Sequence, residues 1–104
     1  MSSIENFEKL LSQGQDNALL RYSLGAAYLK EGHHDVAIIH LEKAVAQDPD
    51  YSAAWKLYGK ALTAANNVPA AIEAYQKGIK VAEKRGDIQA VKEMRVFLKR
   101  IQAK

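Results

Sequence analysis

The sequence predicts an all-α fold, a right-handed α–α superhelix of about six antiparallel helices. The main observation is a period of 34 residues within the 104-residue chain: Leu24-Gly25 returns as Tyr58-Gly59, and Ala37-Ile38 as Ala71-Ile72. A fixed period of this length is typical of stacked supersecondary units. Turn-forming residues separate the apolar helical stretches at matching places. Because stacked units leave a long open surface, proteins of this kind usually work by binding.

The first predicted helix covers residues 3–13. Its apolar residues recur at helical spacing, and Gly14 ends it. Ser2 and Glu5 have the spacing of a capping box at its start. Its apolar positions lie 34 residues before those of a later helix, so it corresponds to half a repeat and is expected to cap the stack. These apolar residues are Ile4, Phe7, Leu10 and Leu11.

Two helical hairpins are predicted next, joined internally at Gly32-His33 and at Asn66-Asn67. Pro49 closes the first hairpin. In the second, Asn67 is a suitable N-cap, and Pro69 stands in the first helical turn, where proline is tolerated. The predicted helices of the two hairpins are 18–31, 34–47, 52–65 and 68–85.

The last predicted helix, 87–102, follows the break at Gly86-Asp87. Asp87 can cap it, and its apolar stripe consists of Val91, Met94, Leu98 and Ile101. We expect this helix to cover the exposed face of the last repeat, as a terminal unit must in a stacked protein.

The residues within the period resemble those of the tetratricopeptide repeat (TPR). Residues 55–62 resemble its first-helix signature: an aromatic residue, a large apolar residue before glycine, and another large apolar residue three positions on. Residues 71–75 resemble the second-helix signature, a small residue followed four positions later by an aromatic one. The resemblance covers residues 18–85, about two-thirds of the chain.

The chain departs from this pattern at three positions. Arg21 stands where Trp55 stands in the second copy, Glu83 replaces a second closing proline, and Gly78 replaces the alanine seen as Ala44. The resemblance implies one domain, 1–104, with these parts: an N-terminal capping helix (3–13), a first repeat (18–51), a second repeat (52–85) and a C-terminal capping helix (87–102). It also implies that Gly25 and Gly59 admit the second helix of each repeat at close range.

The resemblance further implies a protein-binding module, an adaptor or scaffold, that holds a peptide or helix of another protein in its concave groove. The implied groove residues are Leu19, Tyr22, Ser23, Ala26, Leu29 and Lys30 in the first repeat, and Ala53, Lys56, Leu57, Lys60 and Thr63 in the second. Their spacing is consistent with one helix side in each repeat.

The first strip of this groove is apolar and the second is basic, which suits an amphipathic or acidic peptide. Lys56 and Lys60 are expected to be exposed. The groove does not resemble the family's clamp for C-terminal carboxylates, because Ala26 and Leu57 stand at candidate asparagine positions. An alternative stays open, in which Tyr22 and Leu29 pack against a terminal helix folded into the groove.

Charge is distributed unevenly. Residues 1–52 hold 4 Lys/Arg and 8 Asp/Glu, a net charge of −4, whereas residues 53–104 hold 11 and 4, a net charge of +7. A solvated helix face explains such charges most simply. Two alternatives remain: an acidic partner or nucleic acid on the basic half, or self-association of unlike halves into a homodimer. The basic residues are Lys77, Lys80, Lys84, Arg85, Lys92, Arg95 and Lys99.

No pattern of catalytic residues emerges. The chain has no cysteine, and His33, His34 and His40 lack the i, i+4 spacing of facing metal ligands. The glycines form no phosphate-binding loop. We therefore expect no enzyme activity, no catalytic residue, no metal and no cofactor. No apolar stretch approaches the length of a membrane span, so a cytoplasmic location without membrane partners is expected.

Overall fold

The computed structural model describes residues 3–103, which form six α-helices and no strand. Each helix agrees with its predicted range to within one residue at either end, which confirms the all-α solenoid. Ser2, the first residue of the proposed capping box, lies outside the described residues. The helices are α1 (Ser3–Ser12), α2 (Ala18–Lys30), α3 (His34–Gln47), α4 (Ser52–Ala64), α5 (Val68–Arg85) and α6 (Ile88–Gln102).

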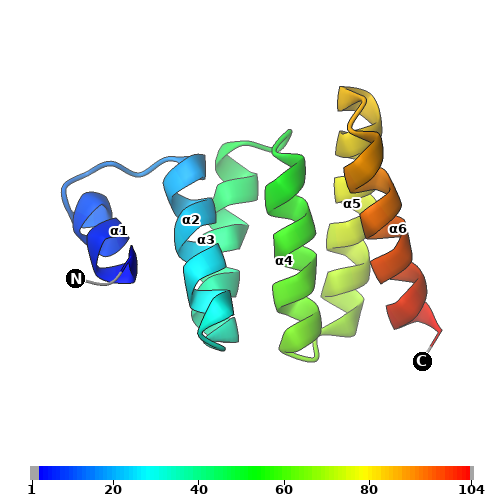
Figure 1. Ribbon diagram of the computed structural model, residues 1–104, viewed down its shortest axis with the longest axis horizontal. Coiled ribbons are helices and arrows are strands. Elements are labelled where there is room, and N and C mark those ends of the chain that lie inside the picture. Colours follow the sequence, from blue (N-terminus) through cyan, green and yellow to red (C-terminus); the bar gives the residue numbers. More distant parts are fainter. Residues whose placement is uncertain (1–2, 104) are drawn as a thin grey trace.

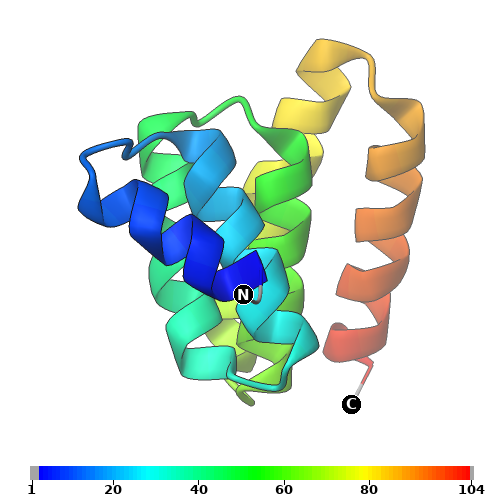
Figure 2. The same cartoon turned by 60° about the vertical axis from the view of Figure 1, so that its left-hand side comes forward.

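The helices form two layers (Figure 1): α2, α4 and α6 lie in one layer, and α3 and α5 lie behind them. Consecutive helices pack against one another, and α4 also contacts both α2 and α6 within its own layer. At the N-terminal end, α1 contacts α2 and crosses it at an angle (Figure 2). The Cα trace has a radius of gyration of 13.5 Å and extents of 40 × 28 × 18 Å, so the stack is an elongated slab.

Side-chain caps set the starts of three helices. The Asn17 side chain accepts a hydrogen bond from the Leu20 backbone N–H at 2.9 Å at the start of α2. Asn67 and Asp87 do the same for α5 and α6, so both predicted caps are confirmed. Such caps satisfy backbone donors that the first turn leaves unpaired. Gly86 ends α5 in the left-handed conformation, with φ of 73°.

Gly25 and Gly59 lie where the two helices of each hairpin come closest. A Cβ built on Gly25 would overlap the Leu41 side chain, and one built on Gly59 would overlap the Tyr75 ring. Leu41 is fully buried and Tyr75 is 2% exposed, so neither has free space to move into. This arrangement confirms the predicted close approach of the second helix at both glycines.

Gly78 has a comparable role at the next helix contact. A Cβ at this position would lie 2.6 Å from the Met94 sulfur on α6 and 2.8 Å from the Trp55 Cβ on α4. The Trp55 Cβ is attached directly to a helix backbone and cannot turn aside. The structure thereby explains why glycine replaces the alanine of the first repeat: α4 and α6 meet at this point of α5.

The main core cluster lies at the C-terminal end of the stack. It joins buried residues of α5, such as Tyr75 and Ala82, to Met94 and Ile101 of α6. The inner face of α6 therefore covers the last repeat, as the sequence predicts. In contrast, no residue of α1 is fully buried. None of the described helices is long and apolar enough to cross a membrane.

Candidate functional site

The predicted groove residues come from α2 and α4, which are neighbours in one layer. Leu19 of α2 and Ala53 of α4 line one cleft of about 380 Å³ at the start of both helices. Farther along, Leu29 and Leu57 pack against the same buried cluster, formed by Ala37, Leu41 and Ala61. The structure thus places residues of the two strips side by side.

Exposure differs greatly along the α2 strip. Leu19 is 65% exposed, which is unusual for a large apolar side chain on a packed helix. Tyr22 is half-buried, and its ring lies 5.0 Å from the Tyr51 ring. Ala26 and Leu29 are also half-buried, whereas Lys30 is exposed. The Ser23 hydroxyl donates to the Leu19 carbonyl within the helix, so it is already engaged.

On α4, the expected exposure of Lys56 is wrong. Its ammonium group lies 3.2 Å from the Glu93 carboxylate of α6, and its side chain is only 27% exposed. The physical reason is that α6 packs alongside α4 and brings an acidic residue to this turn. One helical turn later, Lys60 is exposed as expected, and its Nζ lies 5.4 Å from the centre of the Phe97 ring.

The C-terminal helix does not lie in the groove between α2 and α4. It packs against α5 and α4, and no contact between α6 and α2 is found among the described residues. Tyr22 instead contacts Tyr51, and Leu29 packs on the first hairpin. The alternative in which Tyr22 and Leu29 pack against this terminal helix is therefore wrong.

Two residues of α6 next to the groove were missing from the predicted set. Phe97 and Arg100 line a pocket of about 620 Å³ together with Lys60 and Thr63 of α4. The apolar stripe identified in the sequence included Leu98 but not Phe97. The signal that could have found Phe97 is its place three residues after Met94 and four before Ile101, beside the same stripe.

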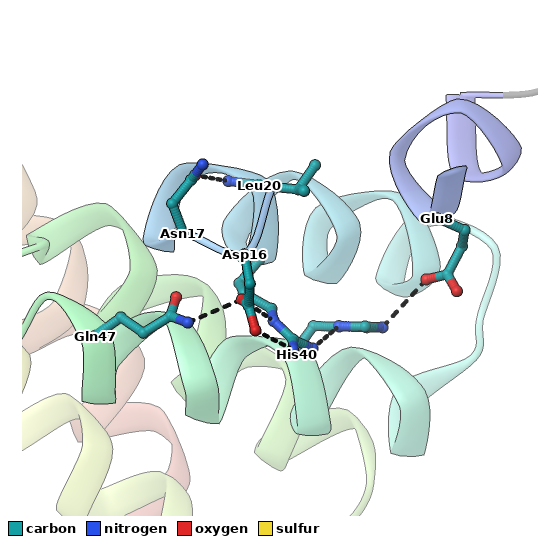
Figure 3. A network of polar contacts seen from close by, with 7 residues as sticks. Glu8, Asp16, Asn17, Leu20, His40 and Gln47 are labelled. Atoms are coloured by element: carbon teal, nitrogen blue, oxygen red, sulfur yellow. Dashed lines mark hydrogen bonds and ion pairs between the residues drawn. The ribbon is translucent and has the colours of Figure 1, made fainter. Parts of the chain in front are cut away.

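Arg21 takes part in a polar network at the N-terminal end of the stack (Figure 3). Its guanidinium donates two hydrogen bonds to the Asp16 carboxylate, at 2.7 and 2.8 Å, and a third to Nδ1 of His40 at 3.1 Å. The Gln47 side chain also donates to Asp16, at 2.8 Å. Glu8 of α1 lies 3.6 Å from Nε2 of His40. The network therefore joins α1, the turn before α2, and α3.

The network shifts the pKa values of Asp16 and His40 and sets the position of the His40 ring proton. Hydrogen bonds from Arg21 and Gln47 hold the pKa of Asp16 well below its ordinary value. Burial, and then the positive charge of Arg21, lower the pKa of His40. Because arginine can only donate, Nδ1 of His40 must accept, and the ring proton resides on Nε2 facing Glu8. Arg21 replaces the tryptophan of the second repeat with a buried cation that pairs with Asp16.

The three histidines are not arranged as metal ligands in the structure. His40 is buried and contacts a guanidinium, whose charge opposes a second cation. Among residues 3–103, no group of three His, Cys, Asp or Glu side chains could hold a metal ion.

Comparisons with known proteins identify the repeats. Two sequence profiles described as tetratricopeptide repeat match residues 28–94 and residues 1–52. A TPR repeat-containing protein of Pseudomonas aeruginosa is 50% identical over 98 residues, covering 94% of this chain and 93% of that protein. A heat-shock protein cognate co-chaperone of Aspergillus fumigatus is 36% identical over 90 residues, covering 86% of this chain but only 26% of that protein.

The fold has a close structural relative. The solution structure of a protein from Bordetella parapertussis matches with a TM-score of 0.85 at 42% identity, covering 99% of this chain and 90% of that one. The profiles, the Pseudomonas relative and the two layers of helical hairpins agree with one another. The chain therefore belongs to the tetratricopeptide-repeat family.

Proposed function

We propose that the chain, a protein-interaction module by its family, binds a peptide or helix of another protein along the face formed by α2 and α4. The observation that carries the proposal is the exposed Leu19, which lines a cleft at the start of α2 and α4 together with Ala53. Peptides that bind grooves of this kind are held by apolar anchors and by a few well-placed polar groups.

The A. fumigatus relative supports a binding role, because its name describes a co-chaperone. This chain spans about a quarter of that protein's length, so the relative's own partner is not transferred to it. In the proposed role the chain acts as an adaptor or scaffold in the cytoplasm and catalyses no reaction. Fractionation of cells that express a tagged chain tests the location.

Placing negative charges on the groove tests the proposal. The groove variant combines Leu19→Asp with Lys60→Glu, two exposed positions on α2 and α4. Lys56 is left unchanged, because its reversal would place two carboxylates together at Glu93. Affinity capture followed by mass spectrometry is expected to recover specific partners with the wild type and to lose them with the variant, while the melting temperature stays unchanged.

The matched control reverses charges elsewhere. Lys80, Lys84, Lys92 and Lys99 are exposed, and among the described residues none has a carboxylate within 4.0 Å. Their reversal to glutamate should leave groove partners bound. If the reversal instead removes salt-sensitive binding of an acidic partner or nucleic acid, the basic half is the functional surface. Binding to nucleic-acid phosphates weakens steeply as the salt concentration rises.

Two results would contradict the proposal that partners bind along the face formed by α2 and α4. The first is full retention of every wild-type partner by the groove variant. The second is that neither variant changes capture but both change the monomer–dimer balance in sedimentation, which would favour self-association of the two oppositely charged halves.

A further inference from the structure

The pocket between α4 and α6, called here the α4–α6 pocket, has the size of a ligand site. Its volume of about 620 Å³ is within the range of about 300–1,000 Å³ typical of such sites. It exceeds the cleft of about 420 Å³ beside Trp55. Its lining residues are Lys60, Thr63, Ala64, Tyr75, Phe97, Arg100, Ile101 and Ala103.

The wall of the α4–α6 pocket is apolar and firmly held. Phe97 lies with its ring centre 5.8 Å from that of Tyr75, and Tyr75 is itself 2% exposed in the main core. Ile101 is also buried. Ala64 and Ala103 add little bulk. Tyr75, Phe97 and Ile101, called here the floor of the pocket, are part of the core. A large apolar side chain of a ligand could therefore enter the pocket without first displacing any of them.

The rim of the same pocket is basic. Lys60 and Arg100 are both exposed, and among the described residues neither has a carboxylate within 4.0 Å. None of the lining residues is acidic. One turn away, Lys56 is already paired with Glu93. The pocket therefore combines an apolar floor with two cations that lack an anionic partner.

These features complement one kind of ligand. A purely apolar side chain would use the floor but leave both cations without a carboxylate partner. A purely acidic segment would use the rim but leave the apolar floor of the pocket unfilled. A large apolar side chain with carboxylates on either side uses both, and the positive charge of the C-terminal half of the chain attracts such a segment.

We propose that the α4–α6 pocket is the anchoring subsite of the groove. It receives a large apolar side chain of an acidic partner peptide against Phe97 and Ile101, while Lys60 and Arg100 bind the flanking carboxylates. This inference rests on the proposed peptide-binding function and assigns the decisive contacts to α6, outside the strips predicted from the sequence.

The test uses short synthetic peptides with blocked ends, so that no terminal charge contributes. The first peptide has a central phenylalanine with two acidic residues on each side. In the second, glycine replaces the phenylalanine, and in the third, amides replace the acids. Titration into ¹⁵N-labelled protein is expected to shift the amides of Thr63, Ala64, Phe97 and Ile101 with the first peptide, and to need far higher concentrations with the others.

A matched pair of variants on α6 tests the charge contact. Arg100→Glu should weaken binding of the first peptide by about tenfold or more, the loss typical of a hydrogen bond to a charged group. Lys99→Glu makes the same charge change on the neighbouring residue, which does not line the pocket. It should change the affinity by less than about threefold, because an exposed charge outside the pocket is screened by water and salt.

Several outcomes would overturn the inference. Equal binding of the first two peptides would show attraction by charge alone, and no shift with any peptide would remove the subsite. A single-stranded oligonucleotide that produces the same shifts when the peptides do not would assign the pocket to nucleic acid. Dimerisation abolished by Arg100→Glu would assign it to a second copy of the chain.

The failure of the subsite is distinguishable from failure of the proposed function. If the first peptide shifts residues of α2, and Leu19→Asp weakens it while Arg100→Glu does not, the groove remains and the anchoring role of α6 is wrong. If partner capture is lost with Leu19→Asp alone but kept by Arg100→Glu, the same conclusion holds for the natural partner.

Discussion

At the scale of single residues, the smallest side chains decide how closely the helices pack. Gly25, Gly59 and Gly78 each lie against a large side chain of a neighbouring helix: Leu41, Tyr75 and Met94 respectively. Glycine inside a helix costs about 1 kcal/mol relative to alanine. The close contact between buried residues offsets this cost, because well-packed interiors gain dispersion energy at every atom in contact.

Gly59→Leu tests this balance. We expect a loss of about 1–3 kcal/mol in the free energy of unfolding, because the new side chain would overlap the buried Tyr75 ring. The better helix propensity of leucine opposes this by less than about 1 kcal/mol. Urea denaturation measures the difference, with Lys84→Leu on an exposed part of α5 as the control. An unchanged or raised unfolding midpoint for Gly59→Leu would show that the contact between α4 and α5 at this glycine can accommodate a larger side chain.

The buried His40 makes stability depend on pH. Its pKa in the folded protein is lowered from 6.5 by burial and by Arg21, while Glu8 and Asp16 oppose the shift. As the pH falls below about 6.5, the unfolded chain binds a proton before the folded one does. The stability that His40 contributes is thus fully present above this pH and is lost below it. The stability that Asp16 contributes is lost only at lower pH, below 3.8, the ordinary pKa of an aspartate.

His40→Asn separates this contribution from that of the other titrating groups. Asparagine keeps an acceptor near the position of Nδ1 but does not titrate, so Arg21 retains its hydrogen bond. Thermal melts at pH 7 and pH 5 should show a smaller decrease for the variant than for the wild type. His33→Asn is the control, since His33 is exposed. An equal decrease in all three proteins would mean that His40 is not the group responsible.

At the scale of elements, α6 both completes the core and shapes the candidate site. Its inner face buries Met94 and Ile101 against α5, while Phe97 and Arg100 on its flank line the pocket shared with α4. The opposite end is built differently. There α1 buries no residue fully, and the polar contact between Glu8 and His40 supplements its packing on α2.

Met94→Ala measures how much α6 contributes. Met94 is fully buried, so we expect the free energy of unfolding to fall by about 2–5 kcal/mol through lost contacts and a residual cavity. Val96→Ala removes a smaller side chain from the 48% exposed outer side of the same helix, and should cost less than about 0.5 kcal/mol. Similar losses in both variants, measured by urea denaturation, would mean that α6 does not cap the core as described.

At the scale of the whole molecule, the stack has two unlike ends. The N-terminal half has a net charge of −4 and the C-terminal half +7, and the helices contact mainly their neighbours along the chain. The charge of the basic half is partly neutralised within the chain, since Lys77 pairs with Glu73 and Arg95 with Glu83. Among the described residues, the cations without a carboxylate partner include Lys60 and Arg100, at the rim of the apolar pocket.

The sequence by itself determined the repeat, the helix bounds, the caps at Asn67 and Asp87 and the role of Gly25 and Gly59. These are local or periodic features: a cap depends on a few neighbouring residues, and a repeat places equivalent residues in equivalent contacts. It also identified residues of α2 and α4 that the structure places side by side.

Only the tertiary structure decided which groups outside the repeat meet. The approach of α6 pairs Lys56 with Glu93 and puts Phe97 and Arg100 beside Lys60. These residues are 37 to 40 positions apart in the sequence, and no internal repeat predicts that they meet. Likewise, Arg21 stands in the sequence where the second repeat has a tryptophan, and only the structure surrounds it with Asp16 and His40. Such contacts depend on the angle at which terminal helices pack, and that angle is set by the fit of many side chains at once.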